Sequence, residues 1–359
     1  MTGKGVNLSV LDSTKPFRLD HIRFDNSART DLDISGHSNV RPRGLLDHNE
    51  FVNLRLVIRG TDEGPTDSIP GRDYQHQIWT GDPGFGDETA IYVEDNVFDV
   101  PHPGAIDANY GGAYVFRFNN VTVHAVYANE FHGVQGLNRA GQRWEIYGNR
   151  YINPGPEIFT AAFMRGGSGF VFNNTLVGLW GSMASLKVER SCDDKPDVGL
   201  CDGTKNIDGN TLGMEGYPCR DQIGRVQDLT PHADWSLSMP WPAQKFYPVY
   251  GWNNKADGTE KNLVQFNACT RESTLHCLEN RDYYNFSPTT GSLQTVGTRR
   301  GPLADRPSQC TVGVAYWATD EDDWNALTPG PDGRLYKCTA PDTWTQLYTP
   351  YPYPHPLQS

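Results

Sequence analysis

The chain has 359 residues and a formal net charge of −12, which argues against nucleic acid as the main partner, because phosphate binding needs a basic face. Its 37 glycines and 25 prolines disfavour long helices, and a hydrophobic share of 37% is too high for a disordered chain. No apolar run reaches the roughly 18 residues of a membrane span.

A degenerate phrase recurs in the first half of the chain. It consists of alternating apolar residues, an asparagine, one spacer and a further apolar residue. The phrase occurs at residues 45–51, 91–98, 114–121, 144–151 and 170–176. Its asparagines are Asn49, Asn96, Asn119, Asn149 and Asn174, at intervals of 47, 23, 30 and 25 residues. An insertion at residues 60 to 89 explains the long first interval, and the others each suit one unit of a repeating structure.

The chemistry of the phrase predicts strands joined by sharp turns. Alternation with a period of two directs one face of each short strand inward. Asparagine tolerates the left-handed conformation of a sharp turn, and asparagines at equivalent places can stack into a hydrogen-bonded ladder that offsets the burial of their amides. Short strands at regular spacing also suit a β-sandwich, but a sandwich is not expected to repeat an asparagine at one fixed place.

On this repeat, the chain resembles the right-handed parallel β-helix proteins of the pectate-lyase-like group. The resemblance covers roughly residues 15 to 190 and resumes at residues 248–254. It implies an all-β solenoid over residues 1–190, with a loop-rich region that wraps or extends it over residues 191–305. Residues 306–359 then form a small β unit with an extended proline-rich tail.

Each phrase is followed by a second short strand, and most of these strands end in a polar residue near glycine. Equivalent positions of successive strands in a parallel sheet stack about 4.8 Å apart. The pattern therefore predicts a column of polar side chains on one outer face. Its expected members are Arg59, Asp107, His132, Arg165 and either Lys187 or Arg190.

This column has the groups needed for β-elimination on an acidic polysaccharide. Arg165, with Arg59 or Lys187, is expected to neutralise a uronate carboxylate. His132 or Tyr110 is the candidate base for the C5 proton of the sugar, and Asp107 would orient His132 or hold a cation such as calcium. The resemblance implies a carbohydrate substrate, although the residue pattern of pectate lyases is not recognisable in the column.

Structural roles compete with these assignments. Arg59 can be a solvated edge charge or the partner of a neighbouring aspartate, Asp107 can cap a turn, and His132 can be a hydrogen-bonded structural histidine. Glycoside hydrolysis by two carboxylates is a further alternative, for which Glu145, Glu189 and Asp107 are available. His21 and His48 are expected to be structural.

All seven cysteines lie beyond residue 191, and no pair has the CxxC spacing of a zinc ribbon or redox motif. Local disulfide bridges are expected between Cys269 and Cys277, between Cys310 and Cys338, and between two of the other three, leaving one free thiol. Those three are Cys192, Cys201 and Cys219. Bridges in a loop-rich region favour an extracellular or cell-surface protein, whose secretion signal, absent from this sequence, would have been removed.

The C-terminal part is expected to form strands at residues 313–320, 334–338 and 343–345, with a turn at residues 331–333. The prolines after Tyr348 predict an extended tail docked on the body. The leading hypothesis from the sequence is an exported polysaccharide lyase. The alternative is a non-catalytic solenoid that associates with itself, such as an adhesin or a filament-forming protein.

Overall fold

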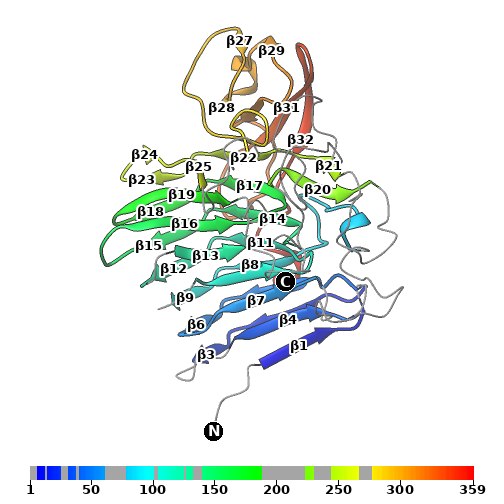
Figure 1. Cartoon of the computed structure of the whole chain (residues 1–359), viewed down its shortest axis with the longest axis vertical. Coiled ribbons are helices and arrows are strands. Elements are labelled where there is room, and N and C mark those ends of the chain that lie inside the picture. The colour runs from blue at the N-terminus through cyan, green and yellow to red at the C-terminus, as the bar shows by residue number, and fades with distance from the viewer. Residues whose placement is uncertain are drawn as a thin grey trace, which may run out of the picture.

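The computed structural model describes residues 6–12, 14–25, 31–37, 40–60, 78–100, 104–124, 127–131, 140–187, 223–229, 244–266 and 277–359. Almost all regular structure in these ranges is β, and most of it lies in three eight-stranded sheets (Figure 1). The all-β class expected from the sequence is confirmed.

The first two sheets are entirely parallel. Sheet A contains, in spatial order, β1 (Val6–Val10), β4 (Leu32–Gly36), β7 (Leu56–Arg59), β10 (Ile106–Asn109), β13 (Tyr127–Phe131), β16 (Ile158–Met164), β19 (Trp180–Lys187) and β25 (Leu263–Phe266). Sheet B contains β2 (Phe17–Asp20), β5 (Gly44–Asp47), β8 (Ile91–Glu94), β11 (Ala113–Arg117), β14 (Arg143–Tyr147), β17 (Ser168–Phe172), β22 (Val249–Trp252) and β26 (Tyr283–Tyr284).

The third sheet is parallel except at one end. Sheet C contains β3 (Arg23–Asp25), β6 (Glu50–Val52), β9 (Val97–Val100), β12 (Asn120–Val123), β15 (Arg150–Ile152), β18 (Thr175–Val177), β23 (Lys255–Ala256) and β24 (Thr259–Glu260). The last two of these strands pair antiparallel.

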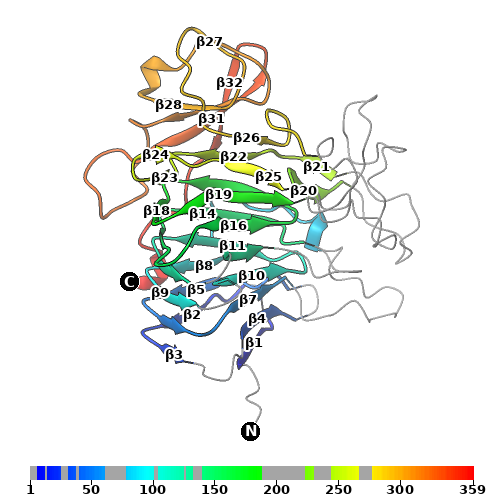
Figure 2. The same cartoon turned by 60° about the vertical axis from the view of Figure 1, so that its left-hand side comes forward.

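From β1 to β19 the described strands enter sheets A, B and C in strict rotation. Each strand from β4 to β16 therefore pairs with the strands three places before and after it in the chain, and the stack rises from β1 towards β25 (Figure 2). This arrangement of long parallel sheets is compatible with the expected β-helix.

The alternating phrases supply the interior of the stack. The larger buried cluster contains inward-facing residues from all three sheets, such as Ile58 of β7, Ile146 of β14 and Tyr151 of β15. Aromatic rings also stack between successive strands of sheet C, where the centroids of Phe51 and Phe98 lie 4.5 Å apart. Burial of these apolar faces is the main driving force for stacking one strand on the next.

The repeated asparagines form a continuous hydrogen-bonded ladder. The side-chain amide of Asn119 donates to Oδ1 of Asn149 at 3.0 Å, and the backbone N–H of Asn119 donates to the same oxygen at 3.0 Å. The same double contact joins every consecutive pair in the ladder, namely Asn49, Asn96, Asn119, Asn149, Asn174 and Asn254. The ladder confirms the expected stacking, and Asn254 extends it where the phrase resumes.

The sharp turn beside the ladder is made by a different residue from the one expected. The left-handed backbone belongs to the residue before each ladder asparagine, as at His48, with φ of 54°, and Phe118, with φ of 56°. Glycine occupies this place before Asn149, with φ of 68°. The ladder asparagines themselves have no positive φ, so their role is to satisfy buried backbone groups rather than to make the turn.

The C-terminal unit lies beyond the end of the three sheets at which β22 and β26 are found (Figure 2). Its strands are β27 (Leu293–Gln294), β28 (Thr298–Gly301), β29 (Gln309–Cys310), β30 (Ala315–Ala318), β31 (Arg334–Ala340) and β32 (Thr343–Tyr348). The last three confirm the strands expected from the sequence. A short 3₁₀ helix, η4 (Leu303–Asp305), completes this unit, and a second, η5 (Pro356–Gln358), ends the tail that follows it. A short antiparallel pair, β20 (Arg225–Asp228) and β21 (Gln244–Phe246), precedes the unit.

Only part of the cysteine scheme lies within the described residues. The bridge between Cys310 and Cys338 is present and closes a separation of 28 residues. Cys277 is a buried free thiol, so the expectation of a bridge from Cys277 was wrong. Burial raises the pKa of this thiol well above its ordinary value, which keeps it protonated and unreactive. The expectations for Cys192, Cys201, Cys219 and Cys269 lie outside the described residues.

The C-terminal tail packs against the outer face of sheet B, as expected of an ordered tail. A second buried cluster joins side chains of this face, such as Tyr147 and Phe172, to Trp317, Trp324 and Tyr348 of the C-terminal unit. The tail is extended until its last residues, which turn into η5 beside β8.

Candidate functional site

The strand register brings three of the expected cations into one row on the outer face of sheet A. Arg59 pairs with Asn109, the last residue of β10. Met164 pairs with Leu186, and Arg165 and Lys187 are the residues that follow them in the sequence. The pairing of β10 with β13, and of β13 with β16, keeps this register across the sheet. We call this row the cationic row; it contains Arg59, Arg165 and Lys187, together with the uncharged Asn109.

Asp107 lies in the neighbouring row rather than in the cationic row. It is two residues before Asn109 on the same strand, so its side chain points to the same face but is displaced along the strand. Asp107 is 5% exposed and forms an ion pair with Arg55 at 3.0 Å. The expectation that Asp107 stacks on Arg59 was therefore wrong: Asn109, two residues later, occupies that place.

Arg59 is held by an aspartate and an aromatic ring. Its Nη2 lies 2.8 Å from Oδ2 of Asp33, and its guanidinium lies 5.3 Å from the centroid of the Tyr110 ring. Burial raises the pKa of the Asp33 carboxyl above its ordinary value, and the Arg59 charge opposes this shift. One third of the Arg59 side chain remains exposed, so the guanidinium can still reach a ligand at the surface.

Tyr110 directly follows β10 in a left-handed conformation, with φ of 52°, and is 5% exposed. This strained backbone places its ring beneath the Arg59 guanidinium. A guanidinium at this position stabilises negative charge on a nearby oxygen.

Arg165 and Lys187 share an aromatic base. The Arg165 guanidinium and the Lys187 ammonium lie 5.3 Å and 5.9 Å from the centroid of the same ring, that of Phe163. Phe163 in turn contacts Phe266 edge to face, with 5.8 Å between centroids. Both cations are half-buried, and the ring supports their apolar stems.

Two other expected residues, His132 and Arg190, lie outside the described residues. Glu145 is one of the carboxylates that the hydrolysis hypothesis considered together with Asp107. It is fully buried on the outer face of sheet B. It contacts Arg143 at 2.6 Å and accepts a hydrogen bond from Tyr348 at 2.5 Å. No substrate can reach Glu145 in this arrangement, so its assignment as a hydrolytic carboxylate was wrong. Its neighbour in that hypothesis, Glu189, also lies outside the described residues.

Further arginines below the tail form buried ion pairs that the sequence analysis did not anticipate. Arg117 contacts Glu94 at 2.5 Å and donates to the backbone oxygens of Tyr351 and Pro352. Together with the Arg143–Glu145 pair, these contacts join the tail to sheet B. Their role is structural because every charged end is enclosed.

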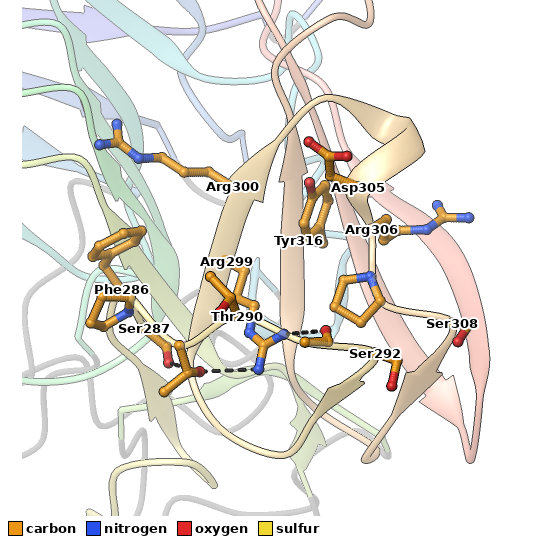
Figure 3. Close-up of a pocket in the computed structure, with 14 residues that line it drawn as sticks. Phe286, Ser287, Thr290, Ser292, Arg299, Arg300, Asp305, Arg306, Ser308 and Tyr316 are labelled. Atoms are coloured by element: carbon orange, nitrogen blue, oxygen red, sulfur yellow. Dashed lines mark hydrogen bonds between the residues drawn. The ribbon is translucent and has the colours of Figure 1, made fainter.

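The C-terminal unit contains a pocket of about 580 Å³ between β28, η4 and the loop that precedes them (Figure 3). Arg299 lies near its centre, and Arg300 and Arg306 extend to opposite sides (Figure 3). Phe286, Ser287, Thr289, Thr290, Ser292 and Tyr316 also line the pocket. No motif in the sequence indicated it, because its residues come from irregular segments without a repeat.

Comparison with protein-family models, with curated proteins and with solved structures finds no match to this chain. Among the residues that the structure describes, no helix is long and apolar enough to cross a membrane. In the same ranges, no cluster of three or more histidine, cysteine or acidic side chains is arranged to hold a metal ion. The calcium site near Asp107 therefore stays a prediction.

Proposed function

We propose that this chain is a parallel β-helix protein that binds an acidic polysaccharide across the outer face of sheet A. Successive strands enter sheets A, B and C in turn, which supports the β-helix. The asparagine ladder, which runs from Asn49 to Asn254 without a gap, supports it as well. The resemblance to the pectate-lyase-like group is consistent with the same architecture.

The observation that carries the binding proposal is that Arg59, Arg165 and Lys187 occupy one row of one sheet. Three strand steps separate Arg59 from Arg165, and one step separates Arg165 from Lys187, at roughly 4.8 Å for each step. A row of cations with this spacing suits a linear chain of negatively charged sugars. The row acts locally against the net charge of −12, because a ligand experiences the charges nearest to it most strongly.

We propose β-elimination as the reaction at this row. Arg165 and Lys187 would neutralise the uronate carboxylate and stabilise the negative charge that develops when the C5 proton leaves. Tyr110, beside Arg59, is the described candidate for the base, and His132 is the other. The electron pair of the C5–H bond forms the C4–C5 double bond, and the glycosidic oxygen leaves C4 and takes up a proton.

Incubation with a panel of uronate polymers tests this reaction through the ultraviolet absorbance of the unsaturated product. The native protein should produce absorbance with at least one polymer, and the Arg165→Ala variant should lose most of the rate. Arg150→Ala, which removes an exposed cation from sheet C, is the matched control and should keep the rate. No product from any uronate polymer would contradict β-elimination.

A non-catalytic role in self-association is the second candidate. It is favoured by β1, β2 and β3, each of which pairs with one strand only and so presents a backbone edge within the described residues. Such edges can pair with another chain. Sedimentation over a range of protein concentrations tests this role: a species that stays monomeric throughout would contradict it.

A further inference from the structure

The pocket of the C-terminal unit holds a buried arginine without a carboxylate partner. Arg299 is 8% exposed, and its guanidinium donates to the backbone oxygens of Gly291 and Leu293 and to the hydroxyl of Thr289. Within the described part of the chain, no carboxylate forms an ion pair with it. Burial lowers the pKa of Arg299 below its ordinary value, which reflects a positive charge that its neutral partners do not compensate.

The rest of the lining adds more positive charge than negative charge. Arg300 and Arg306 lie on the two sides of Arg299, and neither forms an ion pair with a carboxylate among the described residues. Each lies over an aromatic ring: Arg300 lies 5.1 Å from the centroid of Phe286, and Arg306 lies 4.5 Å from that of Tyr336. Arg300 also donates a hydrogen bond to Oδ1 of Asn253. Asp305 supplies the single carboxylate of the lining, so the lining contains three arginines and one acid and carries a net positive charge.

The uncharged part of the lining combines hydroxyl groups with flat apolar surfaces. Ser287, Thr290, Ser292 and Ser308 supply hydroxyls, while Phe286 and Tyr316 supply aromatic rings. A lining that combines hydroxyls with aromatic rings suits a polyhydroxylated ring better than a bare ion. The volume of about 580 Å³ lies in the range of small-molecule sites and accommodates one or two sugar rings.

We propose that this pocket binds an anionic sugar, with Arg299 holding the carboxylate of a uronic acid unit and Arg300 and Arg306 adding positive charge from either side. The site lies in a different part of the chain from the cationic row and does not depend on the β-elimination proposed for sheet A. It would tether the protein to an acidic glycan whether or not the chain cleaves it.

Calorimetric titration of the full chain tests the proposal with three probes: glucuronate, glucose and acetate. Glucuronate should bind, and its affinity should fall as the salt concentration rises because the contact is between charges. Glucose lacks the charge and acetate lacks the ring, so each should bind at least tenfold more weakly. Equal binding of glucose would show that the arginines are irrelevant, and equal binding of acetate would show an unspecific anion site. Either result, or no binding of glucuronate, would overturn the proposal.

Two variants locate the binding. Arg299→Met should weaken glucuronate binding at least tenfold, and Arg300→Met, which leaves the Arg299 contacts to the loop intact, should weaken it severalfold. Circular dichroism checks that each variant folds, and the Arg300 variant still decides the question if the Arg299 variant does not fold. Arg150→Met, which removes an exposed cation of sheet C that belongs to neither proposed site, is the control and should bind glucuronate as the native chain does. Unchanged binding by the folded pocket variants would overturn the assignment.

Discussion

The hydroxyl of Tyr348 donates a hydrogen bond of 2.5 Å to the carboxylate of Glu145, across 203 residues of sequence. Glu145 belongs to the central strand β14 of sheet B, and Tyr348 ends β32 of the C-terminal unit. Around this contact, the tail and sheet B share a buried cluster of aromatic side chains. The C-terminal segment is therefore part of the folded core of the protein.

Removing this one hydroxyl should destabilise the whole chain. Tyr348→Phe leaves the buried Glu145 carboxylate without one of its donors, which should lower the free energy of unfolding by about 1.5–3 kcal/mol. Denaturant unfolding followed by circular dichroism measures the change. Tyr351→Phe is the matched control, because the tail contact made by Tyr351 uses its backbone oxygen, and it should change stability by less than about 0.5 kcal/mol. Equal effects of the two variants would contradict the role of the Tyr348 hydroxyl.

The asparagine ladder should depend on every one of its members. Asn119→Ala removes the oxygen that accepts from the buried backbone N–H of Asn96, which is left without an acceptor. It also removes the side-chain amide that donates to the backbone oxygens of Val93 and Arg117. We expect a loss of at least about 3 kcal/mol, since each buried unsatisfied group costs about 1–3 kcal/mol. Its exposed neighbour Asn120 is the control, and Asn120→Ala should be nearly neutral. A ladder variant as stable as the Asn120 variant would refute the ladder as a source of stability.

Docking of the tail should weaken in acid because of His355. Burial, together with the nearby Arg117 charge, lowers the pKa of His355 from 6.5 to about 4. Between these values the unfolded chain binds a proton that the folded chain does not, so stability falls as the pH drops from about 6.5 to about 4. The contribution of His355 is at most about 1.4 kcal/mol per pH unit.

Thermal melting across this pH range tests the prediction. The native protein should lose stability steadily below pH 6.5, and His355→Gln, which does not titrate, should show a flatter dependence. If the two proteins show the same pH dependence, His355 does not control this transition.

The disulfide between Cys310 and Cys338 should stabilise the C-terminal unit by restricting its unfolded form. Its closed segment of 28 residues corresponds to about 3–4 kcal/mol in the chain-entropy description. The double variant Cys310→Ser and Cys338→Ser should therefore lower the melting temperature. Cys277→Ser is the comparison for loss of a buried thiol without loss of a crosslink. A double variant that melts no earlier than the Cys277 variant would contradict this contribution.

The sequence was sufficient to predict features that depend on local repetition. The period of two and the recurring asparagine predicted the stacked strands and the ladder, because each depends on residues at one fixed place in every phrase. The left-handed conformation was expected at the ladder asparagines, but the residue before each of them adopts it. Either of two adjacent polar residues can make such a turn, as Asn173 and Asn174 illustrate.

The candidate site was predicted less completely, for two physical reasons. Asp107 was placed beside Arg59 because it is the charged residue near the glycines that follow this strand, but Asn109 pairs with Arg59. Tyr110, which is left-handed, separates Asn109 from Gly111, whereas Gly60 directly follows Arg59, so the distance to the following glycine does not give the register. The burial of Glu145 could not be predicted, because its partner Tyr348 follows it by 203 residues and belongs to no repeat.

The central claim is that the cationic row of sheet A binds an acidic polysaccharide, and affinity electrophoresis tests it without requiring turnover. A gel containing a polyuronate should retard the native chain, whereas a gel containing a neutral glucan should not.

The double variant Arg165→Ala and Lys187→Ala removes both cations above Phe163, and its retardation in the polyuronate gel should be at least tenfold smaller than that of the native chain. Arg150→Ala should be retarded as the native chain is. The variant Arg299→Met measures any retention that arises in the C-terminal pocket. Retardation of the double variant equal to that of the native chain, or equal retardation by the neutral glucan, would contradict the account.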